Sequence, residues 1–455
     1  MNWDGDLSVV TPLARFCART RFEDLPDDLV EDAKLKVLDA LACGYAGCEH
    51  ETAELALRLA KRLAPGSATV VFDPVRLAPL DAAFVNSAVI HGILQDDVDL
   101  ESGHPACTVI PAALAMGETC RSSGAELIMA IVLGYEAMWR VGGCGAFLMR
   151  ATARGFRGNT ILGAFGSAAG SARLLRLDEQ RTANALATTA SFAAGLLEPL
   201  NRGTMERCFQ QASNSRQGMM AALLAAEGID ACPTSVEGPT GLYAACADLK
   251  EFPRGAMDSL GREYRLPKAF AKPYPSAGSN TVGIAVAELL VGRHAVRAED
   301  VAGVVVKVLP RFTGVPGYPS IAYKGPFTTV EQALISFPFQ VACMLKNRAV
   351  DLRVIRRDLR DRAIARLATQ IQLVGVDVPH PLWCAIEVEM TNGQRLGATS
   401  DEIDWRHFYL DREVAAGKFR RESAGRLERA RADEVIERVY ALERLPDVSE
   451  LTALL

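Results

Sequence analysis

The chain has 455 residues, of which 49% are hydrophobic and 23% charged, and its formal net charge is −5 at pH 7. This length predicts two domains, and the hydrophobic content excludes an intrinsically disordered chain. The acidic balance gives no basic field for nucleic acid, and no apolar run approaches the roughly 20 residues of a membrane span, so we expect neither kind of partner.

The 11 cysteines are scattered along the chain without the paired Cys-x-x-Cys spacing of zinc sites or a disulfide framework. This distribution predicts buried thiols in a reducing cytoplasm. The first residues also lack the basic region of a signal peptide, which agrees with a cytoplasmic localisation.

From residue 6 to about residue 230 the sequence predicts successive helices. The segment "LPDDLVEDAKLKVLDALACGYAG" places Pro26 at a helix start, followed by acidic residues and apolar residues at helical spacing. The segments "PLDAAFVNSAVIHGILQ" and "PACTVIPAALAMGETCRSS" predict two further helices. Alanine, glycine and serine dominate "ILGAFGSAAGSARLL", which indicates close packing between helices.

The pattern changes near residue 265. Two β-branched segments, "DVAGVVVKVLP" and "AIEVEMTNGQRLGA", predict strands, and the second contains the hairpin signal Asn392-Gly393. The segments "TTVEQALISFPFQVACMLKN" and "DLRDRAIARLATQI" between them predict helices. The result is an α+β unit from roughly 267 to 400, and from residue 410 the sequence is charged and helical again.

An acidic loop joins two of the predicted helices and contains Asp96, Asp97, Asp99 and Glu101. Its spacing does not match a calcium-binding loop, in which ligands alternate around a central glycine. Two other interpretations are an acid/base site and a solvated turn. In the solvated turn, Asp99 and Glu101 face solvent while one of the preceding aspartates caps the next helix.

His104 immediately precedes Pro105, the expected first residue of a helix. The positive end of a helix favours the neutral imidazole, which is the form that accepts a proton near neutral pH. A structural histidine is the alternative interpretation. Cys107 follows this turn, but a thiol in an apolar helix is typical of a core residue rather than a nucleophile.

Three further segments with anion-binding potential lie near expected helix starts. Arg157 and Arg216 each stand among small polar residues, where a guanidinium can bind a carboxylate with two N–H groups. A surface arginine is the alternative in each case. In "AKPYPSAGSN" two prolines stiffen a segment that presents Lys272, Tyr274 and Ser276 to a helix start, an arrangement that favours anions.

Taken together and in this order, these segments resemble the MmgE/PrpD family, which includes 2-methylcitrate dehydratase, cis-aconitate decarboxylase and iminodisuccinate epimerase. The resemblance extends from the Pro26 helix through the acidic loop, "GFRGNTILGAFGSAAGSARLL" and "SNSRQGMMAALLAAEGI" to "ALISFPFQVACML". It implies a mainly α fold with an α+β second domain: a helical domain formed by residues 1–265 and 401–455, and an inserted α+β lid domain of residues 266–400.

The resemblance also implies a homodimeric enzyme that needs no metal or other cofactor and acts on di- and tricarboxylates in a cleft between the helical domain and the lid. Carried over residue by residue, it predicts a set of catalytic residues and a set of substrate-binding residues. The catalytic set is His104, Lys272, Tyr323 and Asp97, and the substrate-binding set is Arg157, Arg216, Asp96, Ser276 and Asn159.

Several positions depart from the family pattern. A family aspartate, threonine and histidine are replaced by Leu94, Val98 and Thr281. A family histidine and a family lysine are replaced by Arg157 and Arg216. Arginine keeps the positive charge but does not exchange protons near neutral pH, so these substitutions remove two acid/base groups.

The leading hypothesis is a lyase similar to 2-methylcitrate dehydratase, which removes a proton beside a carboxylate of a small di- or tricarboxylate and stabilises the resulting carbanion electrostatically. An epimerase or racemase of an amino-dicarboxylate would share this first step. The third hypothesis is a non-catalytic carboxylate-binding relative, suggested by the loss of ionisable family residues.

Overall fold

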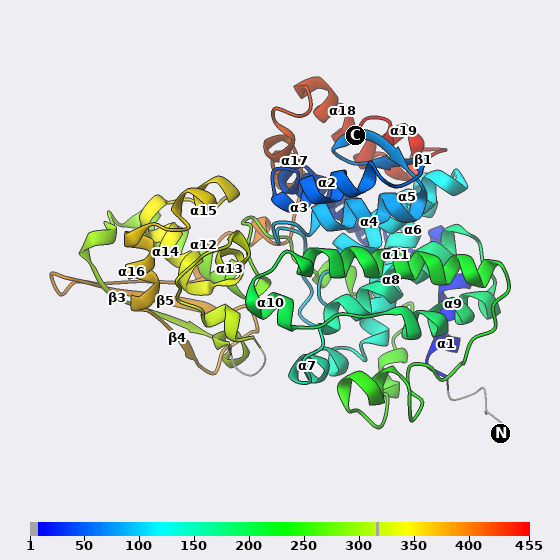
Figure 1. The fold of residues 1–455 in the computed structure, drawn as a ribbon, viewed down its shortest axis with the longest axis horizontal. Coiled ribbons are helices and arrows are strands. Elements are labelled where there is room, and N and C mark those ends of the chain that lie inside the picture. The colour runs from blue at the N-terminus through cyan, green and yellow to red at the C-terminus, as the bar shows by residue number, and fades with distance from the viewer. Residues whose placement is uncertain (1–7, 315–317) are drawn as a thin grey trace.

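The computed structural model describes residues 8–314 and 318–455. Figure 1 shows a large helical part, which contains both the first and the last helices of the chain, beside a smaller part built around a four-stranded sheet. This arrangement confirms the predicted fold class, mainly α with an α+β portion.

The helical part consists of helices from both ends of the described chain. They are α1 (Val10–Arg19), α2 (Asp27–Gly47), α3 (Glu51–Ala60), α4 (Pro79–Ile90), α5 (Ala106–Cys120), α6 (Gly124–Val141), α7 (Ala146–Ala153), α8 (Gly158–Leu174), α9 (Glu179–Phe192), α10 (Glu198–Arg202), α11 (Glu206–Ala226), α17 (Arg412–Ser423), α18 (Arg429–Tyr440) and α19 (Ser449–Thr452). As predicted, α2 begins directly after Pro26.

Helix α8 is packed between α6 and α11, and small residues allow the close approach. A Cβ atom added to Gly218 of α11 would lie 2.2 Å from the carbonyl oxygen of Ala164 in α8. A Cβ atom added to Gly170 of α8 would lie 2.9 Å from the carbonyl oxygen of Ala130 in α6. Glycine therefore lets three helix backbones meet without intervening side chains, as the small-residue segments predict.

A short hairpin interrupts the run of helices that we expected between residues 6 and 230, so that part of the prediction is wrong. Strands β1 (Pro65–Val70) and β2 (Asp73–Leu77) pair in antiparallel orientation. The side chain of Asn86 in α4 accepts from the Val71 amide at 3.0 Å and donates to the Thr69 carbonyl at 2.8 Å. Side-chain contacts from the following helix hold these strands, and the periodicity of the strand residues themselves does not reveal such contacts.

The smaller part combines one sheet with helices. Its elements are α12 (Gly278–Arg293), β3 (Val301–Val308), α13 (Val330–Ile335), α14 (Phe337–Asn347), α15 (Leu352–Asp358), α16 (Arg362–Gln370), β4 (Ile371–Gly375), β5 (Cys384–Met390) and β6 (Arg395–Thr399). The strand order is β4-β3-β5-β6, in which β3 and β4 are parallel and the other pairs antiparallel. Gly393, with φ of 84°, lies in the turn between β5 and β6, which confirms the predicted hairpin.

Two large hydrophobic clusters form the interior. The first combines residues 9–269 with residues 415–451, and the second lies mainly within residues 270–408. The domain limits 1–265, 266–400 and 401–455 stay a prediction, which this distribution of core residues supports.

Among the described residues no single helix is long and apolar enough to cross a membrane, although α6 and α7, bent by 61°, pass that test as a pair.

Candidate active site

The acidic loop between α4 and α5 is buried. Asp96 and Asp97 are fully inaccessible to solvent, and His104 retains only 9% of its exposed surface. Asp99, which we expected to face solvent, is 1% exposed and forms a 2.7 Å ion pair with Arg265, so that prediction is wrong. Burying so much like charge is unfavourable unless each carboxylate has partners, and the loop has such partners.

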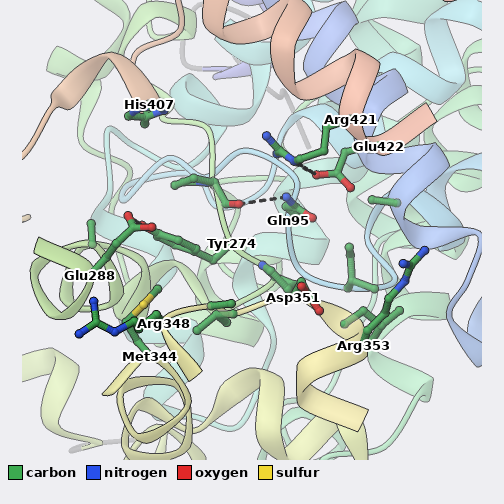
Figure 2. Close-up of a pocket in the computed structure, with 18 of the residues that line it drawn as sticks. Gln95, Tyr274, Glu288, Met344, Arg348, Asp351, Arg353, His407, Arg421 and Glu422 are labelled. Atoms are coloured by element: carbon green, nitrogen blue, oxygen red, sulfur yellow. Dashed lines mark hydrogen bonds and ion pairs between the residues drawn. The ribbon is translucent and has the colours of Figure 1, made fainter. Parts of the chain in front are cut away.

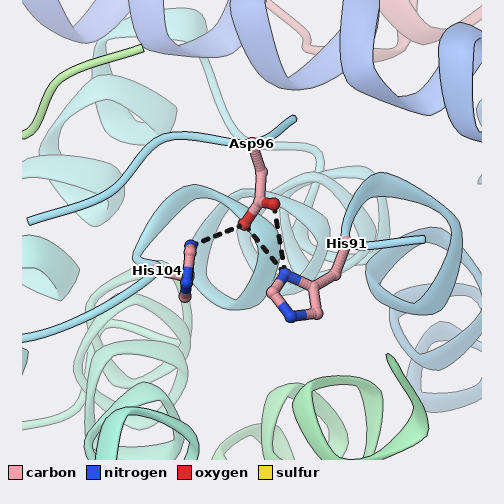
Figure 3. A group of neighbouring side chains, drawn as sticks. All are labelled: His91, Asp96 and His104. Carbon is pink, nitrogen blue, oxygen red and sulfur yellow. Dashed lines mark hydrogen bonds and ion pairs between the residues drawn. The ribbon is translucent and has the colours of Figure 1, made fainter. Parts of the chain in front are cut away.

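Asp96 lies at the centre of a cluster of two histidines and a lysine, and Figure 3 shows the aspartate with the two histidines. Nδ1 of His91 lies 3.1 Å from both carboxylate oxygens, and Nδ1 of His104 lies 3.4 Å from Oδ2. Nζ of Lys272 lies 3.8 Å from Oδ1. The structure thus brings together three of the residues predicted from the sequence and adds His91, which the sequence analysis missed.

The hydrogen bonds of the cluster fix its protonation pattern. Nε2 of His91 accepts from Arg157 Nη2 at 2.8 Å, so its Nδ1–H points to Asp96. Nδ1 of His104 lies 2.9 Å from the Asp97 carbonyl oxygen, which only accepts, so Nδ1 carries the proton. In the neutral ring Nε2 of His104 then carries a lone pair, and no described residue is a partner for it.

Burial and neighbouring charge set the ionisation of the same groups. Burial lowers the pKa of His91 and of His104, because an imidazolium is poorly solvated there. Burial works to raise the pKa of Asp96, but the two histidines and Lys272 outweigh it and hold the pKa well below its usual range. The cluster near neutral pH is therefore a carboxylate beside two neutral imidazoles. Burial lowers the pKa of Lys272, while Asp96 acts in the opposite direction and favours the charged ammonium.

Asp97 has a different environment from Asp96. Its Oδ1 accepts from the amide of Ala106, the first residue of α5, at 2.9 Å, and its Oδ2 accepts from the Tyr135 hydroxyl at 2.8 Å. Burial raises the pKa of Asp97 to about 6. This aspartate caps α5, as one of the two expected alternatives predicted, and it does not line the cavity described next.

A cavity of about 150 Å³ lies beside His104, between the helical part and the smaller part. Arg157 and Asn159 also line it, as do Arg311 and Tyr318 from the segments that follow β3. The Nε of Arg157 and the Oδ1 of Asn159 are buried without a hydrogen-bond partner among the described residues. These polar atoms are available to a ligand.

Four other predicted site residues do not line the cavity. Lys272 and Ser276 are fully buried behind Asp96, where the lysine Nζ donates to the Ser276 carbonyl at 3.3 Å. Arg216 lies within α11 rather than ahead of a helix, and its half-exposed side chain pairs with Asp81 at 3.3 Å. The Tyr323 hydroxyl donates to a backbone carbonyl outside the cavity.

Of two residues that the sequence analysis missed, His91 had a recognisable signal in the sequence and Tyr318 did not. His91 stands at the end of a predicted helix, five residues before Asp96, so a turn returns one side chain to the other. Tyr318 precedes a proline, as Tyr323 precedes a Lys-Gly-Pro turn, so spacing alone does not distinguish the two tyrosines. The structure places Tyr318, and not Tyr323, at the cavity wall.

A larger cleft of about 940 Å³ opens elsewhere along the same loop (Figure 2). Gln95 lines it, whereas neighbouring Asp96 belongs to the histidine cluster. Several of its charged side chains are paired with each other, including Arg421 with Glu422 at 2.8 Å. None of the cluster residues lines this cleft, so we regard the smaller cavity as the candidate active site despite its size.

His91, Asp96 and His104 also have ligand atoms within 4.8 Å of one another, the composition of a two-histidine, one-carboxylate metal site. Two cationic side chains lie against this group, Lys272 beside Asp96 and Arg157 beside His91. A metal ion would have to displace the Nδ1 protons of both histidines, which point to Asp96 and to the Asp97 carbonyl, or the N–H that Arg157 donates to Nε2 of His91. We therefore interpret the group as a hydrogen-bonded acid/base cluster.

The sequence profile of the MmgE/PrpD N-terminal domain matches residues 11–254, which include the acidic loop and its histidines. The chain belongs to the MmgE/PrpD family. This MmgE/PrpD protein is 26% identical to a human cis-aconitate decarboxylase over 95% of its own length and 91% of the relative. It is 28% identical to an Aspergillus terreus cis-aconitate decarboxylase over 54% of its length and 50% of the relative.

Proposed function

We propose that this MmgE/PrpD protein is a lyase that acts on a small carboxylic acid, with His104 as the base that removes a proton from the carbon beside the carboxylate. The observation that carries the proposal is the orientation of this ring. Its Nδ1 is held by the Asp97 carbonyl oxygen, and its unpartnered Nε2 belongs to a ring that lines the cavity. Names of relatives that are lyases support the same reaction class.

The proposed first step moves a proton from substrate carbon to Nε2 of His104, which leaves a carbanion on the substrate and an imidazolium on the enzyme. Asp96, 3.4 Å from the ring, stabilises this imidazolium. If a hydroxide then leaves the adjacent carbon, a carbon–carbon double bond forms, and the imidazolium proton passes to the departing oxygen to give water. Lys272 keeps Asp96 ionised throughout.

Dehydration, as in 2-methylcitrate dehydratase, agrees with the protonation state of the base. Because burial lowers the pKa of His104, the ring is neutral near pH 7 and ready to accept a proton. Decarboxylation releases CO₂ first and then needs an acid at the same position. Epimerisation begins with the same proton removal but ends with proton return from a second group, for which the Tyr318 phenol at the cavity wall is available.

The test uses His104→Gln and a panel of 2-methylcitrate, citrate, malate and 3-hydroxy-3-methylbutanoate in D₂O, followed by proton NMR. Loss of the base should lower turnover by about 10²- to 10⁴-fold. The control is His407→Gln, which changes an exposed histidine of the larger cleft and should retain activity. Full activity of His104→Gln, or loss of activity in His407→Gln, would refute the site assignment.

The product distinguishes the remaining alternatives. Deuterium incorporation without loss of water or CO₂ identifies an epimerase, and binding without any conversion identifies a carboxylate-binding relative. The proposal includes the homodimer expected from the family, which sedimentation velocity would detect as a species of twice the 49.0 kDa chain mass.

A further inference from the structure

The cavity beside His104 has few cationic groups that are free to bind an anion. Two arginines line it, and no lysine does. Arg157 is 1% exposed, and its terminal nitrogens already donate to the Arg207 carbonyl, to the Gln210 side chain and to His91. Among its three nitrogens, Nε is the one that has no hydrogen-bond partner among the described residues.

Arg311 is different, because no described residue forms a hydrogen bond or an ion pair with it. It belongs to the turn after β3, where its guanidinium stacks 5.2 Å from the ring of Phe312. Its Nε is buried and lacks an acceptor. Burial lowers the pKa of Arg311 although Glu101 and Asp99 act to raise it, and a guanidinium stays charged at neutral pH.

The two carboxylates that act on Arg311 electrostatically are Asp99 and Glu101, and both pair directly with another arginine. Asp99 and Glu101 form ion pairs with Arg265 at 2.7 Å and 3.2 Å. Two carboxylates and two guanidinium groups therefore balance in charge here, and Arg311 is the guanidinium that has no direct partner among the described residues. It is partly removed from water and lines the cavity together with Asp99 and the ring of the proposed base. A partly buried charge without a partner is unfavourable, and a ligand carboxylate would supply the partner with two parallel N–H···O bonds.

A second polar group at the cavity wall can recognise a hydroxyl. Asn159 is 8% exposed, and its buried Oδ1 has no donor among the described residues. A substrate hydroxyl would satisfy this oxygen. Asn159 directly follows the first residue of α8, so its backbone is fixed by the helix that Arg157 precedes.

Most of the remaining wall is apolar. Side chains from both parts of the chain contribute to it, including Leu94, Val98, Leu148, Met149, Leu200 and Ile321. A second or third carboxylate placed against such side chains would lose its hydration without gaining a cationic partner. A cavity of about 150 Å³ also limits the ligand to a short carbon skeleton.

We infer that the substrate is a short hydroxy acid with one carboxylate, bound by Arg311, a hydroxyl that donates to Asn159, and an apolar flank. The inference rests on the proposed function, and it replaces the di- or tricarboxylate expected from the sequence. Arg311 takes the role of carboxylate anchor that the sequence analysis gave to Arg216.

The test measures binding separately from turnover. Isothermal titration with His104→Gln, which retains the cavity but lacks the base, compares 3-hydroxy-3-methylbutanoate, its uncharged amide, malate and citrate. The hydroxy acid should bind at least about 10-fold more tightly than its amide or citrate, because charge-assisted hydrogen bonds contribute about 1.5–3 kcal/mol. Arg311→Gln in the same background should weaken binding about 10- to 100-fold, and Arg311→Lys should weaken it less.

The control is Arg360→Gln, which removes an exposed arginine outside the cavity and should leave the affinity unchanged. Equal or tighter binding of citrate, or an unchanged affinity in Arg311→Gln, would overturn the inference. If citrate is converted and conversion depends on His104, the inference fails while the proposed function stands. If the hydroxy acid binds through Arg311 but is never converted, the inferred ligand class stands and the lyase function fails.

Discussion

Replacement of Lys418 by methionine should break the contacts between helix α17, near the C-terminal end of the chain, and the segments of the candidate active site. The ammonium of Lys418 is 4% exposed and lies 2.6 Å from Asp39 Oδ1. It also donates to the backbone carbonyls of Lys272 at 3.1 Å and Gln95 at 3.4 Å. A residue from the end of the chain thus joins the two segments that carry Lys272 and Asp96.

The magnitude follows from what methionine leaves behind. Methionine keeps the aliphatic volume but removes the charge, so Asp39, 1% exposed and with no partner for its Oδ2 among the described residues, becomes an unpaired buried carboxylate. Burial acts to lower the pKa of Lys418, but Asp39 raises it above its usual value, which indicates a strong ion pair. Removing one member of such a pair costs about 3–5 kcal/mol of unfolding free energy.

The assay combines urea unfolding with measurement of kcat, for Lys418→Met and for the double variant Asp39→Asn/Lys418→Met. The double variant removes the stranded charge and should recover part of the lost stability. It should not recover activity, because the Lys272 and Gln95 carbonyls still lack their donor. A Lys418→Met protein within about 0.5 kcal/mol of the original, or a double variant no more stable than the single one, would refute this reasoning.

Two further predictions concern the base and the helix packing. Burial lowers the pKa of His104 from 6.5, and the base must be neutral, so kcat/KM should be constant above pH 6.5 and fall as the pH decreases through the lowered pKa. In Asp96→Asn the fall in kcat/KM should move to still lower pH, because Asp96 acts to raise the pKa of His104. A fall that begins above pH 6.5 would contradict the assignment. Gly218→Ala should lower the unfolding free energy by about 1–3 kcal/mol, because the new Cβ meets the Ala164 carbonyl. Gly417→Ala, at an exposed position of helix α17 with open space around it, should raise the unfolding free energy by about 0.5–1 kcal/mol. Urea titration of both variants checks the opposite signs.

Several elements were predictable because their signals are local. A proline followed by two acidic residues begins α2, and Asn392-Gly393 supplies the turn between β5 and β6. The hairpin of β1 and β2 was not predictable in this way, because Asn86 of a later helix holds it. Strand propensity describes a segment by itself, and it fails where a side chain of another element supplies the hydrogen bonds.

The sequence by itself indicated several ionisable groups of the cluster, namely the acidic pair, His104 next to a proline, and Lys272 in a stiffened segment, but it missed His91. It did not distinguish Arg157 from Arg216, since both stand among small polar residues. Tertiary structure buries Arg157 against His91 and leaves Arg216 half exposed on α11, and it turns Arg311 toward the cavity. The physical reason is that the environment of a charge depends on partners and exclusion of water, and both come from elements far away along the chain.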